Sequence, residues 1–200
     1  MKVLFLTNNL DVTRPLLDWL KETEGADNVA LSSEGVCSGH FARVGQFAEI
    51  EFVVSYNYLP IVRQDIIDLF PHRIINLHIS LLPWNRGMSP NIWSFLEGTP
   101  AGVTIHEIDA GVDTGDVLLQ KEIVFDYERE TLRSSYEKSH ALISQLFRDN
   151  WDRLKSGMIT PTPQGHGGTL HRRKDSRTFN HLIDYEDTIA EFVRKVGDGV

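Results

Sequence analysis

Two polar side chains, Asn76 and His78, lie two residues apart at the end of an apolar segment, residues 73–78, that we expect to form a strand. Side chains two apart on a strand leave the same face, and a Pro- and Gly-bearing segment follows at residues 80–89. An amide donor beside an imidazole suits stabilisation of an oxyanion with proton transfer nearby. Asn and His at strand ends also commonly satisfy backbone groups, so the spacing by itself leaves both interpretations open.

Three carboxylates, Asp109, Asp113 and Asp116, lie on a Gly-rich segment. Such a group could bind a cation, orient a histidine or make Asx turns. The segment lacks the spacing and final Glu of a calcium loop, and the histidines show no pairing typical of zinc. We therefore expect no metal and expect turns at Asp109 and Asp116, whereas the role of Asp113 stays open.

Two basic segments could bind a phosphate. Arg86 follows Trp84 and Asn85 and precedes a glycine, and residues 171–174 read His-Arg-Arg-Lys. A solvated basic surface is the alternative for both segments. Residue types alone do not decide between the two.

Periodicity predicts the elements that must position these side chains. Strands are expected at residues 2–7, 28–31, 50–55, 73–78, 102–108 and 117–125. Helices are expected at residues 10–22, 61–70, 90–97, 132–156 and 185–196. Strands that alternate with helices in the first half imply an α/β domain with a mainly parallel sheet. Ligands of such sheets bind beyond the carboxyl ends of the strands.

Composition restricts the class of protein. The chain has 200 residues, is 41% hydrophobic and carries a formal charge of −8, which suits one acidic globular domain. The acidic balance argues against a nucleic-acid partner. Cys37 is the only cysteine, which fits a reducing compartment. The sequence shows neither a signal peptide nor a run of about 20 apolar residues, so we expect a cytoplasmic protein that does not bind a membrane.

Two motifs in order carry a family resemblance. Residues 76–83 read Asn-Leu-His-Ile-Ser-Leu-Leu-Pro, and residues 109–116 read Asp-Ala-Gly-Val-Asp-Thr-Gly-Asp. Together they resemble the formyltransferases that use 10-formyltetrahydrofolate. The resemblance implies a Rossmann-like core and a catalytic trio of Asn76, His78 and Asp113. Asn76 would donate to the oxyanion that forms when an amine attacks the formyl carbon, His78 would stabilise it and move protons, and Asp113 would orient or electrostatically support His78 or hold a proton-relaying water.

The resemblance also implies a co-substrate, 10-formyltetrahydrofolate, and no metal. It places the pterin near Tyr58, Leu59, Pro60 and Ile61 and against Ile108, Asp109 and Val112. A plain strand-to-helix turn, with Pro60 starting the helix, is the alternative for the first of these segments.

Departures from the family pattern restrict the class of molecule that could accept the formyl group. Residues 7–11 lack the Gly-rich phosphate loop of glycinamide ribonucleotide enzymes, and we expect no C-terminal β-barrel of the methionyl-tRNA enzymes. The sequences of residues 83–95 and 168–175 resemble those of the nucleotide-sugar N-formyltransferases within this family. The resemblance thus implies a 3- or 4-amino-dideoxy sugar linked to dTDP. Its expected binding residues are Trp84, Asn85, Arg86, His171, Arg172 and Lys174.

Two alternatives remain open, namely a formyltransferase for methionyl-tRNA or another small amine, and a non-catalytic folate- or nucleotide-binding relative. We expect a catalytic domain over residues 1–157 and a C-terminal extension, a loop and a short helix, over residues 158–200. The product is expected to enter lipopolysaccharide or O-antigen biosynthesis, and a homodimer is left open.

Overall fold

The computed structural model describes residues 1–41 and 49–198. Its centre is a six-stranded sheet of order β2-β1-β3-β4-β6-β7. The strands are β1 (Val3–Leu6), β2 (Val29–Ser32), β3 (Phe52–Tyr56), β4 (Ile74–His78), β6 (Gly102–Glu107) and β7 (Val117–Glu122). β1, β2, β3 and β4 run parallel to one another, whereas β6 is antiparallel to both β4 and β7. The expected α/β fold with a mainly parallel sheet is confirmed.

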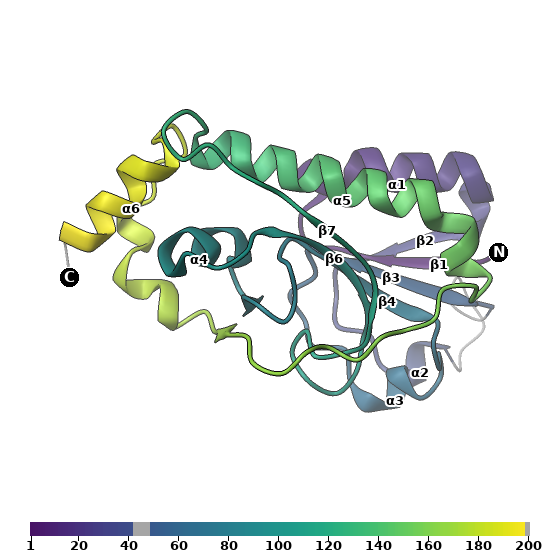
Figure 1. Cartoon of the computed structure of the whole chain (residues 1–200). Coiled ribbons are helices and arrows are strands. Elements are labelled where there is room, and N and C mark those ends of the chain that lie inside the picture. Colours follow the sequence, from purple (N-terminus) through teal and green to yellow (C-terminus); the bar gives the residue numbers. More distant parts are fainter. Residues whose placement is uncertain (42–48, 199–200) are drawn as a thin grey trace.

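Helices cover both faces of this sheet (Figure 1). They are α1 (Leu10–Glu24), α2 (Ser38–Phe41), α3 (Gln64–Ile67), α4 (Pro90–Glu97), α5 (Leu132–Lys155) and α6 (Ile189–Asp198). Figure 1 shows α1 and α5 on one face and α2 and α3 on the other. Because both faces are covered, every residue of β1 and β3 is buried, which explains their continuous apolar runs.

The helix ends follow the local sequence. The Thr131 hydroxyl accepts a hydrogen bond from the backbone N–H of Ser134, and this capping box starts α5 at Leu132, the predicted first residue. Gly98 closes α4 in a left-handed conformation, directly after the predicted last residue, Glu97. On its inner face α5 buries Phe147 and Trp151 in the same core as Leu16 of α1.

Two helix predictions are wrong at their first residues. The helix expected at residues 61–70 forms only at α3, and the Ile61 side chain is 77% exposed, because it belongs to the connection after β3. The helix expected from residue 185 begins at Ile189. Thr188 and Glu191 exchange backbone-to-side-chain hydrogen bonds of 2.8 and 3.2 Å there, and this capping box starts the helix after Thr188 and not after Asp184, the residue before the expected first position.

The segment after α5 returns along the sheet towards α4. Val117 and Thr162 exchange backbone hydrogen bonds of 2.8 and 2.9 Å, and two short strands, β5 (Arg86–Gly87) and β8 (Leu170–His171), pair in parallel. Beyond them, Phe179 and Phe192 pack in one cluster with residues of α4. The domain boundary at residue 157 stays a prediction. In the part of the chain that is described, no helix combines the length and apolarity needed to cross a membrane.

Candidate active site

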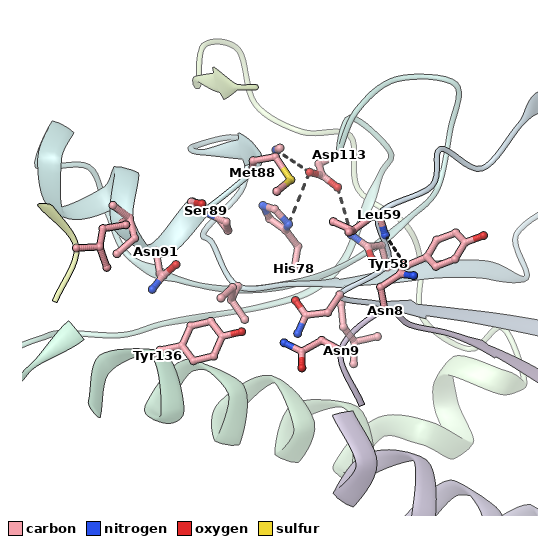
Figure 2. Close-up of a pocket in the computed structure, with 18 of the residues that line it drawn as sticks. Asn8, Asn9, Tyr58, Leu59, His78, Met88, Ser89, Asn91, Asp113 and Tyr136 are labelled. Atoms are coloured by element: carbon pink, nitrogen blue, oxygen red, sulfur yellow. Dashed lines mark hydrogen bonds and ion pairs between the residues drawn. The ribbon is translucent and has the colours of Figure 1, made fainter. Parts of the chain in front are cut away.

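The three residues expected to act together meet at the carboxyl end of β4. Asn76 and His78 come from the strand itself, and Asp113 comes from the connection between β6 and β7. Asn76 Nδ2 donates to Asp113 Oδ1 at 3.2 Å, and His78 Nδ1 lies 3.6 Å from Asp113 Oδ2. Figure 2 shows His78 and Asp113 facing each other at this point. The fold thus brings together the trio expected from the family resemblance, and its catalytic role stays a prediction.

Local backbone geometry holds Asp113 in place. Its φ is +52°, a left-handed value that is unfavourable for a residue with a Cβ and needs support from its surroundings. The Gly87 N–H donates to Asp113 Oδ2 at 2.7 Å, and Gln164 Nε2 donates to the backbone carbonyls of Asp113 and Gly115 at 2.8 Å each. A Cβ on Gly115 would lie 1.9 Å from the Glu107 carbonyl oxygen, so only glycine fits this turn.

The charges of the trio are set by burial and by each other. Burial by itself raises the pKa of the Asp113 carboxyl, but His78, His106 and the Gly87 N–H together hold this pKa well below its ordinary value. Burial lowers the pKa of His78, and the negative charge of Asp113 partly opposes that shift. At neutral pH the site therefore holds a carboxylate beside a neutral imidazole.

The tautomer of His78 follows from its partner. Nε2 lies 3.1 Å from the backbone carbonyl oxygen of Asn85, which can only accept, so Nε2 carries the hydrogen. Nδ1 is then the basic atom, and it faces Asp113. A proton taken up at Nδ1 would be stabilised by the carboxylate, which suits His78 to accept a proton during a reaction.

Sequence reasoning missed His106, which lies directly opposite Asn76 in the register of β4 and β6. His106 Nδ1 donates to the Glu107 carbonyl at 2.7 Å, and its Nε2 lies 3.2 Å from Asn76 Nδ2 and 3.5 Å from Asp113 Oδ1. The Asn76 amide nitrogen therefore contacts two partners in the protein, Asp113 and His106. An oxyanion bound by Asn76 would have to replace one of them. Strand alternation alone could not reveal this contact, because it does not give the register.

Two cavities meet at Asn76 and Asp113. The first, the asparagine-lined cavity, has a volume of about 450 Å³ and contains Asn8, Asn9, Asn57, Asn91 and Tyr136 in its wall (Figure 2). The second, the apolar-rimmed cavity, has a volume of about 360 Å³. Residues shared by both walls are Tyr58, Leu59, Asn76, Gly87, Met88 and Asp113. Two ligands, one in each cavity, could therefore meet at Asn76 and Asp113.

The structure brings all residues expected at the pterin to one place. The apolar-rimmed cavity is lined by Tyr58, Leu59, Pro60, Ile61, Ile108, Asp109 and Val112. The first segment is fixed by Asn8 Oδ1, which accepts from the Leu59 N–H at 2.8 Å, and by the Tyr58 hydroxyl, which donates to the Glu34 carbonyl at 2.6 Å. Whether these residues hold a pterin stays a prediction.

The residues expected at the nucleotide sugar are dispersed. His171 and Arg172 line the apolar-rimmed cavity, whereas Trp84, Asn85, Arg86 and Lys174 line neither cavity. Asn85 is fully buried and donates through Nδ2 to the Thr99 hydroxyl at 2.7 Å. Because its carbonyl accepts from His78, Asn85 positions the His78 imidazole. Among the described residues, no group of three or more His, Cys, Asp or Glu side chains could hold a metal ion.

Arg86 offers a test of these roles. Its guanidinium donates to Gln164 Oε1 at 2.6 and 3.0 Å, and Gln164 in turn holds the turn that carries Asp113. We expect Arg86→Gln to lower kcat about tenfold, because Asp113 loses a support, with the KM for the acceptor unchanged. Steady-state kinetics with each substrate varied would measure this. A tenfold rise in the acceptor KM at constant kcat would instead support the phosphate-binding role expected from sequence.

Comparison with known proteins agrees with this geometry. The family model described as formyl transferase matches residues 2–149. The chain belongs to the formyltransferase family. Its fold resembles that of the formyltransferase PseJ from Anoxybacillus kamchatkensis, solved in complex with UDP-4,6-dideoxy-4-formamido-L-AltNAc and tetrahydrofolate. The TM-score is 0.86 with 36% identity, over 98% of this chain and 100% of that one. The expected Rossmann-like formyltransferase fold is confirmed.

This chain covers different shares of the length of other members of the formyltransferase family. A methionyl-tRNA formyltransferase of Thermodesulfovibrio yellowstonii is 39% identical over 115 residues, 57% of this chain and 37% of that protein. The chain thus spans less than half of the length of this relative. A dTDP-4-amino-4,6-dideoxyglucose formyltransferase of Mycobacterium bovis is 27% identical over 203 residues, 98% of this chain and 85% of that protein. The expected likeness to nucleotide-sugar formyltransferases is confirmed.

Proposed function

We propose that the protein transfers the formyl group of 10-formyltetrahydrofolate to the amino group of a nucleotide-linked amino-dideoxy sugar. The observation that carries this proposal is the meeting of two cavities at Asn76 and Asp113, with His78 in the wall of one of them. A transfer between two bound molecules needs both at one reactive centre, because holding them together removes most of the entropic barrier.

The residues of the apolar-rimmed cavity suit a folate. Leu59, Ile61 and Val112 are large apolar side chains that are 66, 77 and 45% exposed at this cavity, which is unusual for a protein surface without a ligand. A flat heterocycle would cover them, and backbone groups of residues 108–112 could pair with its polar edge. When bound, the folate supplies the formyl carbon. No metal is needed for this chemistry.

The asparagine-lined cavity suits a sugar. Among the described residues in its wall, Asp113 is the one with a charge at neutral pH, and several others carry amide or hydroxyl groups that can pair with sugar hydroxyls. The C-terminal segment contributes Tyr185, which is 46% exposed. An amine bound here lies beside His78, whose Nδ1 can take a proton from it while Asp113 stabilises the resulting imidazolium.

The proposal also specifies the nucleotide of the acceptor and the position of its amino group on the sugar. We propose a 4-amino sugar first, since the names of PseJ's ligand and of the Mycobacterium bovis relative both specify that position. Uridine diphosphate and dTDP are both candidates, because PseJ is bound to a UDP-sugar and the second relative is named for a dTDP-sugar. A 3-amino sugar linked to dTDP, the cytoplasmic location, the polysaccharide pathway and a homodimer stay predictions from sequence.

An acceptor panel tests the function. Release of tetrahydrofolate from 10-formyltetrahydrofolate is measured with UDP- and dTDP-linked 4-amino and 3-amino sugars and with methionyl-tRNA. We expect turnover with at least one amino sugar and none with methionyl-tRNA. Efficient formylation of methionyl-tRNA while all sugars are ignored would contradict the sugar assignment and leave formyl transfer standing. Absence of turnover with every acceptor would favour a non-catalytic binding role.

Folate binding can be tested without an acceptor. A ligand specific to the native state at 100 times its Kd stabilises the fold by about 2.7 kcal/mol. For a chain of this size, that corresponds to a rise in Tm of roughly 5 to 10 °C. We therefore expect 5-formyltetrahydrofolate to produce such a rise in a thermal-denaturation experiment. An unchanged Tm at millimolar ligand would contradict the proposed co-substrate.

A further inference from the structure

The apolar-rimmed cavity has a basic side that the proposed function does not use. Arg172 and Arg173 are exposed and line this cavity, and Lys174 follows them. Within residues 1–41 and 49–198, none of these three side chains forms an ion pair, whereas Arg63 and Arg133 each contact a carboxylate. In a chain with a formal charge of −8, unpaired cations gathered beside a ligand cavity need an explanation.

The backbone of this basic segment is fixed at both ends. On one side the His171 carbonyl accepts from the Met88 N–H at 2.9 Å, within the pairing of β5 and β8. On the other side Asp175 Oδ2 accepts from the Arg172 N–H at 2.7 Å, so this carboxylate is engaged by the backbone. The His171 ring stacks on the Trp93 ring, with 3.8 Å between the ring centroids. The two arginines are therefore held at the cavity by the same strand pair that supports Asp113 through Gly87.

We propose that Arg172 and Arg173 bind the γ-linked glutamate tail of the folate, so that the protein prefers polyglutamylated folates to the monoglutamate. This inference rests on the proposed function. The pterin end must lie towards the trio, because the formyl group has to reach His78, and the glutamate end then leaves through the rim. Each added γ-glutamyl residue brings one more carboxylate, and a guanidinium can bind a carboxylate through two parallel hydrogen bonds.

Binding of the acceptor's diphosphate explains the basic segment less well than binding of the glutamate tail. A diphosphate also attracts arginine, but neither Arg172 nor Arg173 is part of the wall of the asparagine-lined cavity. The nearest apolar neighbour in the same segment is Leu170, 44% exposed, which lines the folate side together with Val112. The aromatic part of a folate followed by its glutamate carboxylates matches this order, in which apolar side chains are followed by Arg172 and Arg173.

Binding measurements separate these ligands. The Kd of 5-formyltetrahydrofolate is measured by calorimetry in its monoglutamate and pentaglutamate forms, for the unmodified protein, for the double variant Arg172→Gln/Arg173→Gln and for Arg177→Gln. Arg177 is the matched control, because it is exposed in the same segment and lines neither cavity. We expect the unmodified protein to bind the pentaglutamate about fivefold to tenfold more tightly, as a few exposed ion pairs would give.

The double variant is expected to bind the two folate forms with equal affinity, and Arg177→Gln is expected to keep the preference for the pentaglutamate. Added salt should reduce the preference in the unmodified protein. Equal affinity of the unmodified protein for both forms, or a preference that survives in the double variant, would overturn the inference while formyl transfer stands. A double variant with normal folate affinities and a raised KM for the nucleotide sugar would overturn it in favour of the diphosphate. Failure of both folate forms to bind would overturn the proposed function and this inference together.

Discussion

His78→Ala is expected to lower kcat for formyl transfer by at least about 100-fold, the loss typical of removing a proton-transfer group. His78 Nδ1 is the basic atom nearest to the acceptor side, and no other described side chain in the wall of the asparagine-lined cavity is a base apart from Asp113. The low pKa of Asp113 makes it a poor substitute. Steady-state kinetics with saturating folate and acceptor would measure the change.

The matched control is His166→Ala. His166 is exposed and lines neither cavity, so its replacement should leave kcat unchanged. His78 is only 6% exposed, and its loss leaves the Asn85 carbonyl without a donor, so a stability loss of about 1 to 3 kcal/mol is expected as well. Thermal denaturation of the variant would show that it still folds. A folded His78→Ala protein with near-normal turnover would remove His78 from the mechanism.

Asp113→Asn is expected to lower kcat at least about 100-fold and to move the acid limb of the pH–rate profile to lower pH. The carboxylate of Asp113 raises the pKa of His78 against the effect of burial, so removal of its charge lowers that pKa further. Neutral His78 would then persist to more acidic pH, while each proton it accepts is stabilised less. The substrate amine is the same in both proteins, so the difference between the two profiles reports on the enzyme.

Asp116→Asn is the control for this substitution. Asp116 lies on the same connection, undergoes the same chemical change and lines neither cavity, so both kcat and the acid limb should stay in place. An acid limb that moves to higher pH in Asp113→Asn, or a kcat close to that of the unmodified protein, would mean that Asp113 does not act through His78.

Local sequence was sufficient for most elements of the sheet and for part of the site. The runs at residues 2–7 and 50–55 could be recognised as strands because both faces of β1 and β3 are covered, which leaves no exposed position in either and makes both strands mostly apolar. Asn76 and His78 share a strand, so their common face follows from covalent geometry alone. Asp113 could be assigned only through the family resemblance, since a Gly-rich segment with three carboxylates is equally consistent with turns.

Helix starts were less predictable where two capping signals compete. Both Asp184 and Thr188 could begin the last helix, and the exchange of hydrogen bonds between Thr188 and Glu191 selects the second. The apolar spacing of residues 61–70 matched a helical face, yet the first of these residues, Ile61, is exposed at the rim of a cavity, as is Leu59 just before the segment. A ligand site keeps apolar residues at the surface for reasons that periodicity cannot distinguish from core packing.

The sequence, together with the family resemblance that it carries, therefore determined the mainly parallel sheet, the predicted trio of Asn76, His78 and Asp113, and the segments expected at the pterin. Only the tertiary structure decided which groups surround the trio. His106 reaches Asn76 through the antiparallel register of β4 and β6, and Gln164 links Arg86 to the Asp113 turn across a long separation in sequence. Such contacts depend on register and on chain crossings that bring distant residues together, and local propensity carries no information about either.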